Sequence, residues 1–247
     1  MTPSLVESAC ALRRMARRRT LPASLALCAL LLVYATFVHP VATARQALSA
    51  ATAIASIVVL IVSAGIIADD RERGRLALAA THPVAPAVWV LGRWLAVWGF
   101  AAAVLGGSST ILLAVAAKPS WPGVGGFALA TAAALAHLAA LAALSVALSC
   151  GAGSTAQLLL LLALWIVGAV PPEVIAQSVG GAWAGGAART LWTALPTSWA
   201  LTRLHAWSLG AGTPEPVLAL VLVLQPALWL GAGARRLAAA ELGVRGD

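Results

Sequence analysis

The sequence predicts an all-α integral membrane protein with six transmembrane helices. Of its 247 residues, 61% are hydrophobic and 10% are charged, and its mean hydropathy is +0.93. This composition is far too apolar for a water-soluble globule of this size. The apolar residues also gather into long runs, and a helix that crosses a bilayer needs roughly 20 of them in a row.

Six apolar runs meet this length if one short member is allowed. They cover residues 21–40, 47–68, 88–117, 124–150, 155–170 and 217–234. The sequence Gly151-Ala-Gly-Ser154 separates the fourth run from the fifth. No internal repeat or low-complexity linker divides the chain, so residues 1–247 are expected to form a single transmembrane domain.

Residues 1–20 predict an amphipathic helix that lies along the membrane surface before the first span. Ser4 and Glu7 have the spacing of a capping box at its start. One apolar stripe recurs at helical spacing and consists of Leu5, Ala9, Leu12 and Ala16. Arginines crowd the end of the segment, where they would contact anionic headgroups. A disordered basic tail that only sets topology is the alternative.

The lysines and arginines are distributed unevenly over the predicted loops. With both termini inside, twelve fall on the cytoplasmic side: Arg13, Arg14, Arg17, Arg18, Arg19, Arg71, Arg73, Arg75, Arg93, Arg235, Arg236 and Arg245. Four fall outside: Arg45, Lys118, Arg189 and Arg203. This bias predicts cytoplasmic termini in a plasma (bacterial inner) membrane. The net charge of +8 does not indicate nucleic-acid binding, because the bases form no single patch with aromatic residues.

The densest charge cluster lies between the second and third runs, in residues 69–86, which we call the elbow. Three acids and three bases stand within seven positions: Asp69, Asp70, Arg71, Glu72, Arg73 and Arg75. Leu76, Ala79, Ala80 and Pro83 then recur at helical spacing, which predicts a short helix along the membrane. Pro83 and Pro86 would end this helix and redirect the chain. A plain solvated loop is the alternative.

The elbow and the start of the third run resemble the permeases of the type-2 ABC exporter family. Those permeases carry Glu-Arg-Glu-x-Gly-x-Leu-x-x-Leu, Thr-Pro-Val and Gly-Lys-x-x-Ala between their second and third spans. The matching residues are Arg71, Glu72, Arg73, Gly74, Leu76, Leu78, Thr81, Pro83, Val84, Gly92, Arg93, Leu95 and Ala96. The chain departs from the pattern in the inserted His82, in Ala77 where an acid is common, and in Arg93 in place of lysine.

The resemblance implies that the elbow is a coupling helix that contacts a separate ABC ATPase subunit. The coupling residues would be Asp69, Asp70, Arg71, Glu72, Arg73, Gly74, Arg75, Leu76, Leu78 and Pro83. The chain would be a non-enzymatic permease subunit of an exporter, paired in the lipid bilayer with a second copy or a sister permease. The sequence has no Gly-x-x-x-x-Gly-Lys-Ser/Thr loop. ATP and magnesium are therefore expected on the partner ATPase, and no cofactor or metal on this chain.

A few polar side chains within the predicted spans are candidates for a substrate path. They are His137, Ser108, Ser109, Gln157 and Gln225. An ionisable residue such as His137 inside a span is a functional candidate by default. The favoured alternative is a neutral imidazole that bonds a neighbouring helix. Beside it runs a stripe of small residues suited to close helix packing: Ala128, Ala132, Ala136 and Ala140.

Residues 171–213 predict short outer helices before the last span, or an ordinary outer loop. They hold four tryptophans of the kind that gather at headgroup level: Trp183, Trp192, Trp199 and Trp207. Two other functions stay open: a haem-export permease of cytochrome c maturation, and a non-transporting assembly or immunity protein. An intramembrane hydrolase is disfavoured, because Gly151-Ala-Gly-Ser154 has the wrong order for a Gly-x-Ser-Gly nucleophile.

Overall fold

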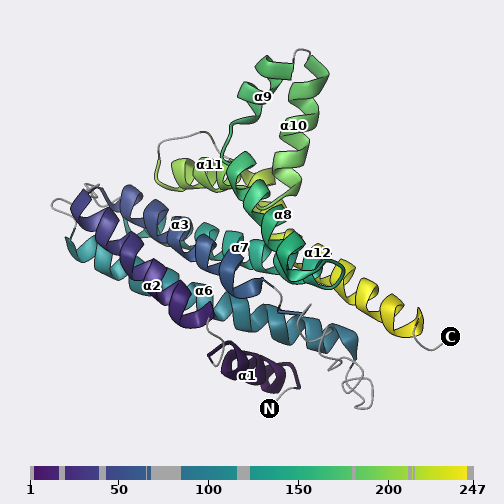
Figure 1. Cartoon of the computed structure of the whole chain (residues 1–247). Helices are drawn as coiled ribbons and strands as arrows, with labels where there is room; N and C mark the ends of the chain where they lie inside the picture. Colours follow the sequence, from purple (N-terminus) through teal and green to yellow (C-terminus); the bar gives the residue numbers. More distant parts are fainter. Residues whose placement is uncertain are drawn as a thin grey trace.

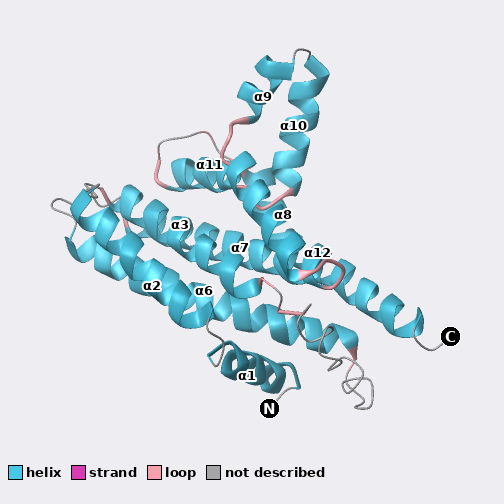
Figure 2. Cartoon of the chain, viewed as in Figure 1, coloured by secondary structure: helices cyan, strands magenta, loops and turns pink. Residues whose placement is uncertain are grey.

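The computed structural model of the chain describes residues 3–16, 20–38, 43–64, 66–67, 85–115, 123–179, 182–210, 213 and 215–243. Within these ranges all regular structure is helical, as the sequence predicts (Figure 2). The elements are α1 (Pro3–Ala16), α2 (Thr20–Val33), the π-helix η1 (Tyr34–Val38), α3 (Ala44–Ser63), α6 (Pro86–Val115), α7 (Val124–Ser149), α8 (Ser154–Val167), α9 (Pro172–Val179), α10 (Ala182–Ala194), α11 (Ser198–Ser208) and α12 (Pro216–Gly243).

Four of the described helices are long and apolar enough to cross a membrane, namely α3, α6, α7 and α12. In Figure 1, α3, α6 and α7 run alongside one another, and α12 packs against α7. The apolar segments Pro22–Val38 and Ser154–Val167 are helical but shorter. The structure is therefore that of a multi-pass helical membrane protein, with four candidate spans in the described part of the chain where the sequence predicts six.

The fifth predicted run, residues 155–170, is shortened because the chain turns at Gly168. A Cβ atom there would lie 2.6 Å from the carbonyl oxygen of Leu164 and 3.2 Å from the side chain of Thr197. Thr197 caps the start of α11, and the backbone N–H of Trp199 donates to the carbonyl of Gly168 at 3.1 Å. The end of α8 is thus set by its contact with α11.

The helix starts differ from the sequence prediction at two caps. A capping box does exist, but it lies at Thr43 and Gln46, so that α3 begins at Ala44 instead of residue 47. The capping box expected from Ser4 and Glu7 is wrong, because α1 already begins at Pro3 and Ser4 lies inside its first turn.

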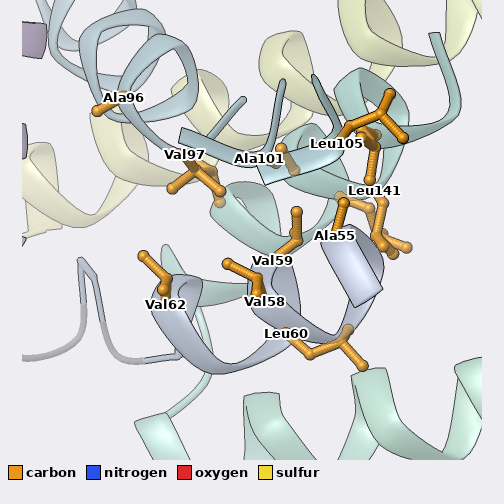
Figure 3. Packing of buried hydrophobic residues seen from close by; sticks show 14 of the residues in the cluster. Ala55, Val58, Val59, Leu60, Val62, Ala96, Val97, Ala101, Leu105 and Leu141 are labelled. Atoms are coloured by element: carbon orange, nitrogen blue, oxygen red, sulfur yellow. The ribbon is translucent and has the colours of Figure 1, made fainter. Parts of the chain in front are cut away.

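The core of the bundle is built from valine, leucine and alanine side chains of α3, α6 and α7. Figure 3 shows Val58 and Val59 of α3 gathered with Val97 and Ala101 of α6. Many alanines of α7 are fully buried, which lets neighbouring backbones approach closely. Dispersion contacts of this kind hold helices together in lipid, where hydrophobic transfer contributes little.

Between α8 and α12 the described residues form three short helices, α9, α10 and α11. Figure 1 shows α9 and α10 as a hairpin that projects from the bundle. Arg189 and Glu173 pair across this hairpin at 3.2 Å. The indole of Trp192 is buried and donates to the carbonyl of Val170 at 2.8 Å, so this tryptophan anchors the hairpin to the end of α8.

Candidate functional site

The structure describes the two flanks of the elbow. Residues 69–84 lie outside the described ranges, and with them all of the predicted coupling residues: Asp69, Asp70, Arg71, Glu72, Arg73, Gly74, Arg75, Leu76, Leu78 and Pro83. On one flank, α3 is followed by the buried Ile66 and Ile67. On the other, α6 begins at Pro86 and packs along α3. The elbow therefore joins the end of one packed helix to the start of its neighbour.

A buried cluster of three polar side chains holds the end of α3 that leads into the elbow. We call Ser63, Ser145 and Gln157 the Ser–Gln cluster; each is 0% exposed. The Gln157 Nε2 donates to the Ser63 carbonyl at 3.1 Å, and to both the carbonyl and the hydroxyl of Ser145 at 3.0 Å. The Ser145 hydroxyl donates to that of Ser63. One side chain of α8 thus ties α3 to α7 through a chain of hydrogen bonds.

The start of α6 is held from one side by α1, through a close backbone approach at Gly92. A Cβ atom there would lie 2.6 Å from the Glu7 Cβ and 3.3 Å from the Ser8 backbone nitrogen. Ala9 and Leu12, from the stripe that the sequence predicts to face the membrane, are exposed. The opposite face of α1 therefore makes the contact with α6, and part of the apolar stripe is left for the bilayer.

Aromatic side chains hold the same part of α6 from the other side. Trp94 and Trp98 stack at 5.6 Å between ring centres. Their indole nitrogens donate to the α7 carbonyls of Ala139 at 2.9 Å and Leu135 at 3.2 Å. The Arg93 side chain is only 2% exposed, and its guanidinium carbon lies 4.7 Å from the centre of the Trp89 ring. The helix that follows the elbow is therefore firmly attached to its neighbours.

His137 of α7 and His205 of α11 are both buried, each 2% exposed, on two helices that pack against each other. Among the described residues, the His137 Nδ1 and the His205 Nε2 have no hydrogen-bond partner. Burial lowers the pKa of His205 to about 4, and the nearby Arg45 adds to the effect, whereas the Ala130 backbone opposes it. His205 is therefore neutral near pH 7. His205 lies outside the six apolar runs, so no pattern in the sequence points to it as a buried ionisable residue.

The other predicted path residues belong to separate contacts. Gln225 donates from Nε2 to the carbonyl of Thr193 at 3.0 Å, while its Oε1 finds no partner in the described ranges. Ser108 is buried in α6, and the hydroxyl of the adjacent Ser109 likewise lacks a described partner. Gln157 is part of the Ser–Gln cluster. The described hydrogen bonds thus link Gln225 to α10 and Gln157 to α3 and α7.

An apolar groove of about 130 Å³ lies between α7, α11 and α12. Its lining includes Ala132 and Ala136, two members of the stripe that the sequence predicts to pack closely. The close packing predicted for the stripe is therefore present only in part: Ala136 and Ala140 pack against the buried side chains of α11 and α12, whereas Ala132 is exposed in the groove. The hydroxyl of Ser208, also in the lining, donates to the carbonyl of His205 at 3.1 Å.

The fold and these sites place the chain in the class of multi-pass helical membrane proteins. The described part of the chain shows no identifiable metal centre. There, no group of three or more histidine, cysteine or acidic side chains could hold a metal ion. No protein-family model matches the chain, and no curated protein matches it. The function of the chain is therefore inferred from its own residues.

Proposed function

We propose that the chain is the membrane-spanning permease subunit of an ATP-driven ABC exporter, and that the elbow couples it to a separate ATPase. The observation that carries the proposal is the gathering of six charges within residues 69–75 between two apolar helices. Exposed ion pairs contribute roughly 0–1 kcal/mol each to folding, so stability gives little reason for such a cluster. A docking surface explains such a cluster, because charge complementarity fixes the partner and its register.

In this proposal the two shorter apolar helices also enter the bilayer, which gives six membrane segments. The 14 residues of α8 extend about 21 Å, against a hydrocarbon core of about 30 Å. Local thinning of the bilayer accommodates such a mismatch. The exposed leucines of α8, Leu158, Leu159, Leu160 and Leu162, favour a lipid or protein environment over water.

The orientation with both termini in the cytoplasm rests on the twelve-to-four charge bias. It places the elbow on the side where an ATPase binds ATP and magnesium. Two permeases, identical or sister chains, would then stand over two ATPases, each docked beneath an elbow.

The packing around the elbow supports a route for the coupling motion. A push on the elbow enters the bundle through the end of α3 and the start of α6. At the end of α3, the Ser–Gln cluster passes the displacement to α7 and α8. At the start of α6, Trp94 and Trp98 pass it to α7. Rocking of these helices exposes the substrate path outward, with His137 as its candidate polar group.

A charge swap in the elbow tests the proposal. We expect the double variant Glu72→Lys with Arg73→Glu to insert and fold normally, because the residues it changes contribute little to stability. ATPase copurification, or transport per ATP hydrolysed, should fall sharply. The control is Arg235→Glu with Arg236→Glu, which alters two exposed charges of α12. It is the larger charge change, because it lowers the net charge by four units while the elbow swap leaves it unchanged, and it should still lower coupling much less. Normal transport by the elbow variant, with its ATPase still bound, would show that the elbow is only a loop.

A further inference from the structure

The apolar groove between α7, α11 and α12 opens onto the outer surface of two candidate spans. Leu129 of α7 and Val223 of α12 both line it and are exposed, Val223 by 64%. In a membrane this surface faces hydrocarbon, so the mouth of the groove opens to lipid. The groove faces hydrocarbon in a membrane whether or not the chain binds an ATPase.

The chemistry of the groove favours a hydrocarbon occupant. The groove exists because small side chains line two of its helices, namely Ala132, Ala133 and Ala136 of α7 and Ala219 of α12. Apolar cavities of comparable size, about 150 Å³, stay free of water and bind apolar molecules. An empty groove would also forfeit the dispersion contacts of its lining. A flexible acyl chain from the adjacent leaflet satisfies both conditions.

The α11 helix and the start of α12, which both line the groove, also carry a pair of opposite charges. The Arg203 Nε donates to the Glu215 Oε1 at 3.2 Å, and the pair joins α11 to the start of α12. Arg203 stands one helical turn before Trp207, and Glu215 one turn before Ala219, and both of these later residues line the groove. A guanidinium beside a carboxylate complements the phosphate and the ammonium of a zwitterionic headgroup.

We propose that the groove binds one acyl chain of a membrane phospholipid whose zwitterionic headgroup lies at the Arg203–Glu215 pair. The bound lipid would fill the gap that α7 leaves beside α11 and α12. The lining of the groove comes from α7, α11 and α12, whereas the described flanks of the elbow are α3 and α6.

Photocrosslinking in reconstituted vesicles tests the proposal. The full chain is placed in phosphatidylethanolamine vesicles that contain a small fraction of the same lipid with a diazirine on one acyl chain. We expect crosslinks concentrated on residues 129–136 and 219–223. In Ala133→Phe, a ring fills the groove, and labelling of these peptides should fall to the level of the exposed face of α8. The matched control, Ala163→Phe on that exposed face, should leave groove labelling unchanged.

Two further measurements keep the test decisive if Ala133→Phe fails to fold. Ala132→Phe changes an exposed residue of the lining and should lower the labelling in the same way. A free fatty acid with the same diazirine should label the groove less than the phospholipid, because it lacks the headgroup. Labelling that is evenly spread over the exposed helices, or that either folded phenylalanine variant leaves unchanged, overturns the site. Equal labelling by the fatty acid overturns the phospholipid assignment.

Discussion

Replacement of Gln157 by leucine tests whether the Ser–Gln cluster holds α8 to the bundle. Leucine is similar in size to glutamine, but it has no amide hydrogen to donate. The carbonyl of Ser63 and both oxygens of Ser145 therefore lose this donor. Gln157 and Leu161 are the only residues of α8 that are fully buried, and Leu164 and Trp165 add partly buried contacts with the core.

The expected loss follows from these contacts. A buried polar group left without its partner costs about 1–3 kcal/mol in proteins generally. Hydrogen bonds between membrane helices average about 0.6 kcal/mol and reach about 1.7 kcal/mol. The Ser63 carbonyl keeps its bond from the backbone of Ile66 at 3.1 Å, so we expect a net loss of about 1–2 kcal/mol. For a chain of this size that lowers Tm by roughly 2–8 °C.

Thermal unfolding of the purified protein in detergent measures this loss, and hydrogen exchange locates it. Exchange in residues 154–167 should accelerate in the Gln157→Leu variant, because α8 loses its anchor. The matched control is Gln177→Leu, an exposed glutamine of α9, which should change stability by no more than about 0.5 kcal/mol. Unchanged Tm and unchanged exchange in α8 would refute the idea that Gln157 anchors this helix.

Two further predictions concern α1 and His205. Gly92→Leu should displace α1 at a cost of about 1–3 kcal/mol, because even a Cβ atom would lie 2.6 Å from Glu7. The displacement should appear as faster hydrogen exchange in residues 3–16. The control Gly99→Leu places its side chain in open space on the same helix and should not change this exchange. The folded-state pKa of His205 is about 4, below the unfolded value near 6.5, so the unfolded chain binds the proton first. Stability should be full above pH 6.5 and fall toward pH 4, and the Tm difference between pH 7 and pH 5 should shrink in His205→Gln. An undiminished difference would exclude His205 as its source.

The helical bundle could be predicted from the sequence with useful accuracy. The predicted runs at 88–117 and 124–150 correspond to α6 (Pro86–Val115) and α7 (Val124–Ser149) within two residues. Such agreement arises because an apolar run of this length has one way to satisfy its backbone in lipid, which is a helix. The start of α3 was also available in the sequence, since Thr43 and Gln46 have the capping-box spacing that the structure uses.

The sites required the tertiary structure. Ser63 and Ser145 lie 82 residues apart, and Ser63 and Gln157 lie 94 apart, so no local pattern relates them. In the same way, the alanine stripe of α7 has the spacing for close packing along its whole length, but it packs against α11 and α12 at Ala140 and lines a groove at Ala132.

The sequence by itself determined the environment of the chain and its helices, because backbone hydrogen bonding and bilayer thickness act on each segment separately. It also held the charged elbow, whose place between two spans follows from order along the chain. Only the tertiary structure decided which polar side chains meet, that α1 packs closely against Gly92, and where the apolar groove lies. These features depend on the rotation and register of each helix against its neighbours, and those are set by packing across the bundle.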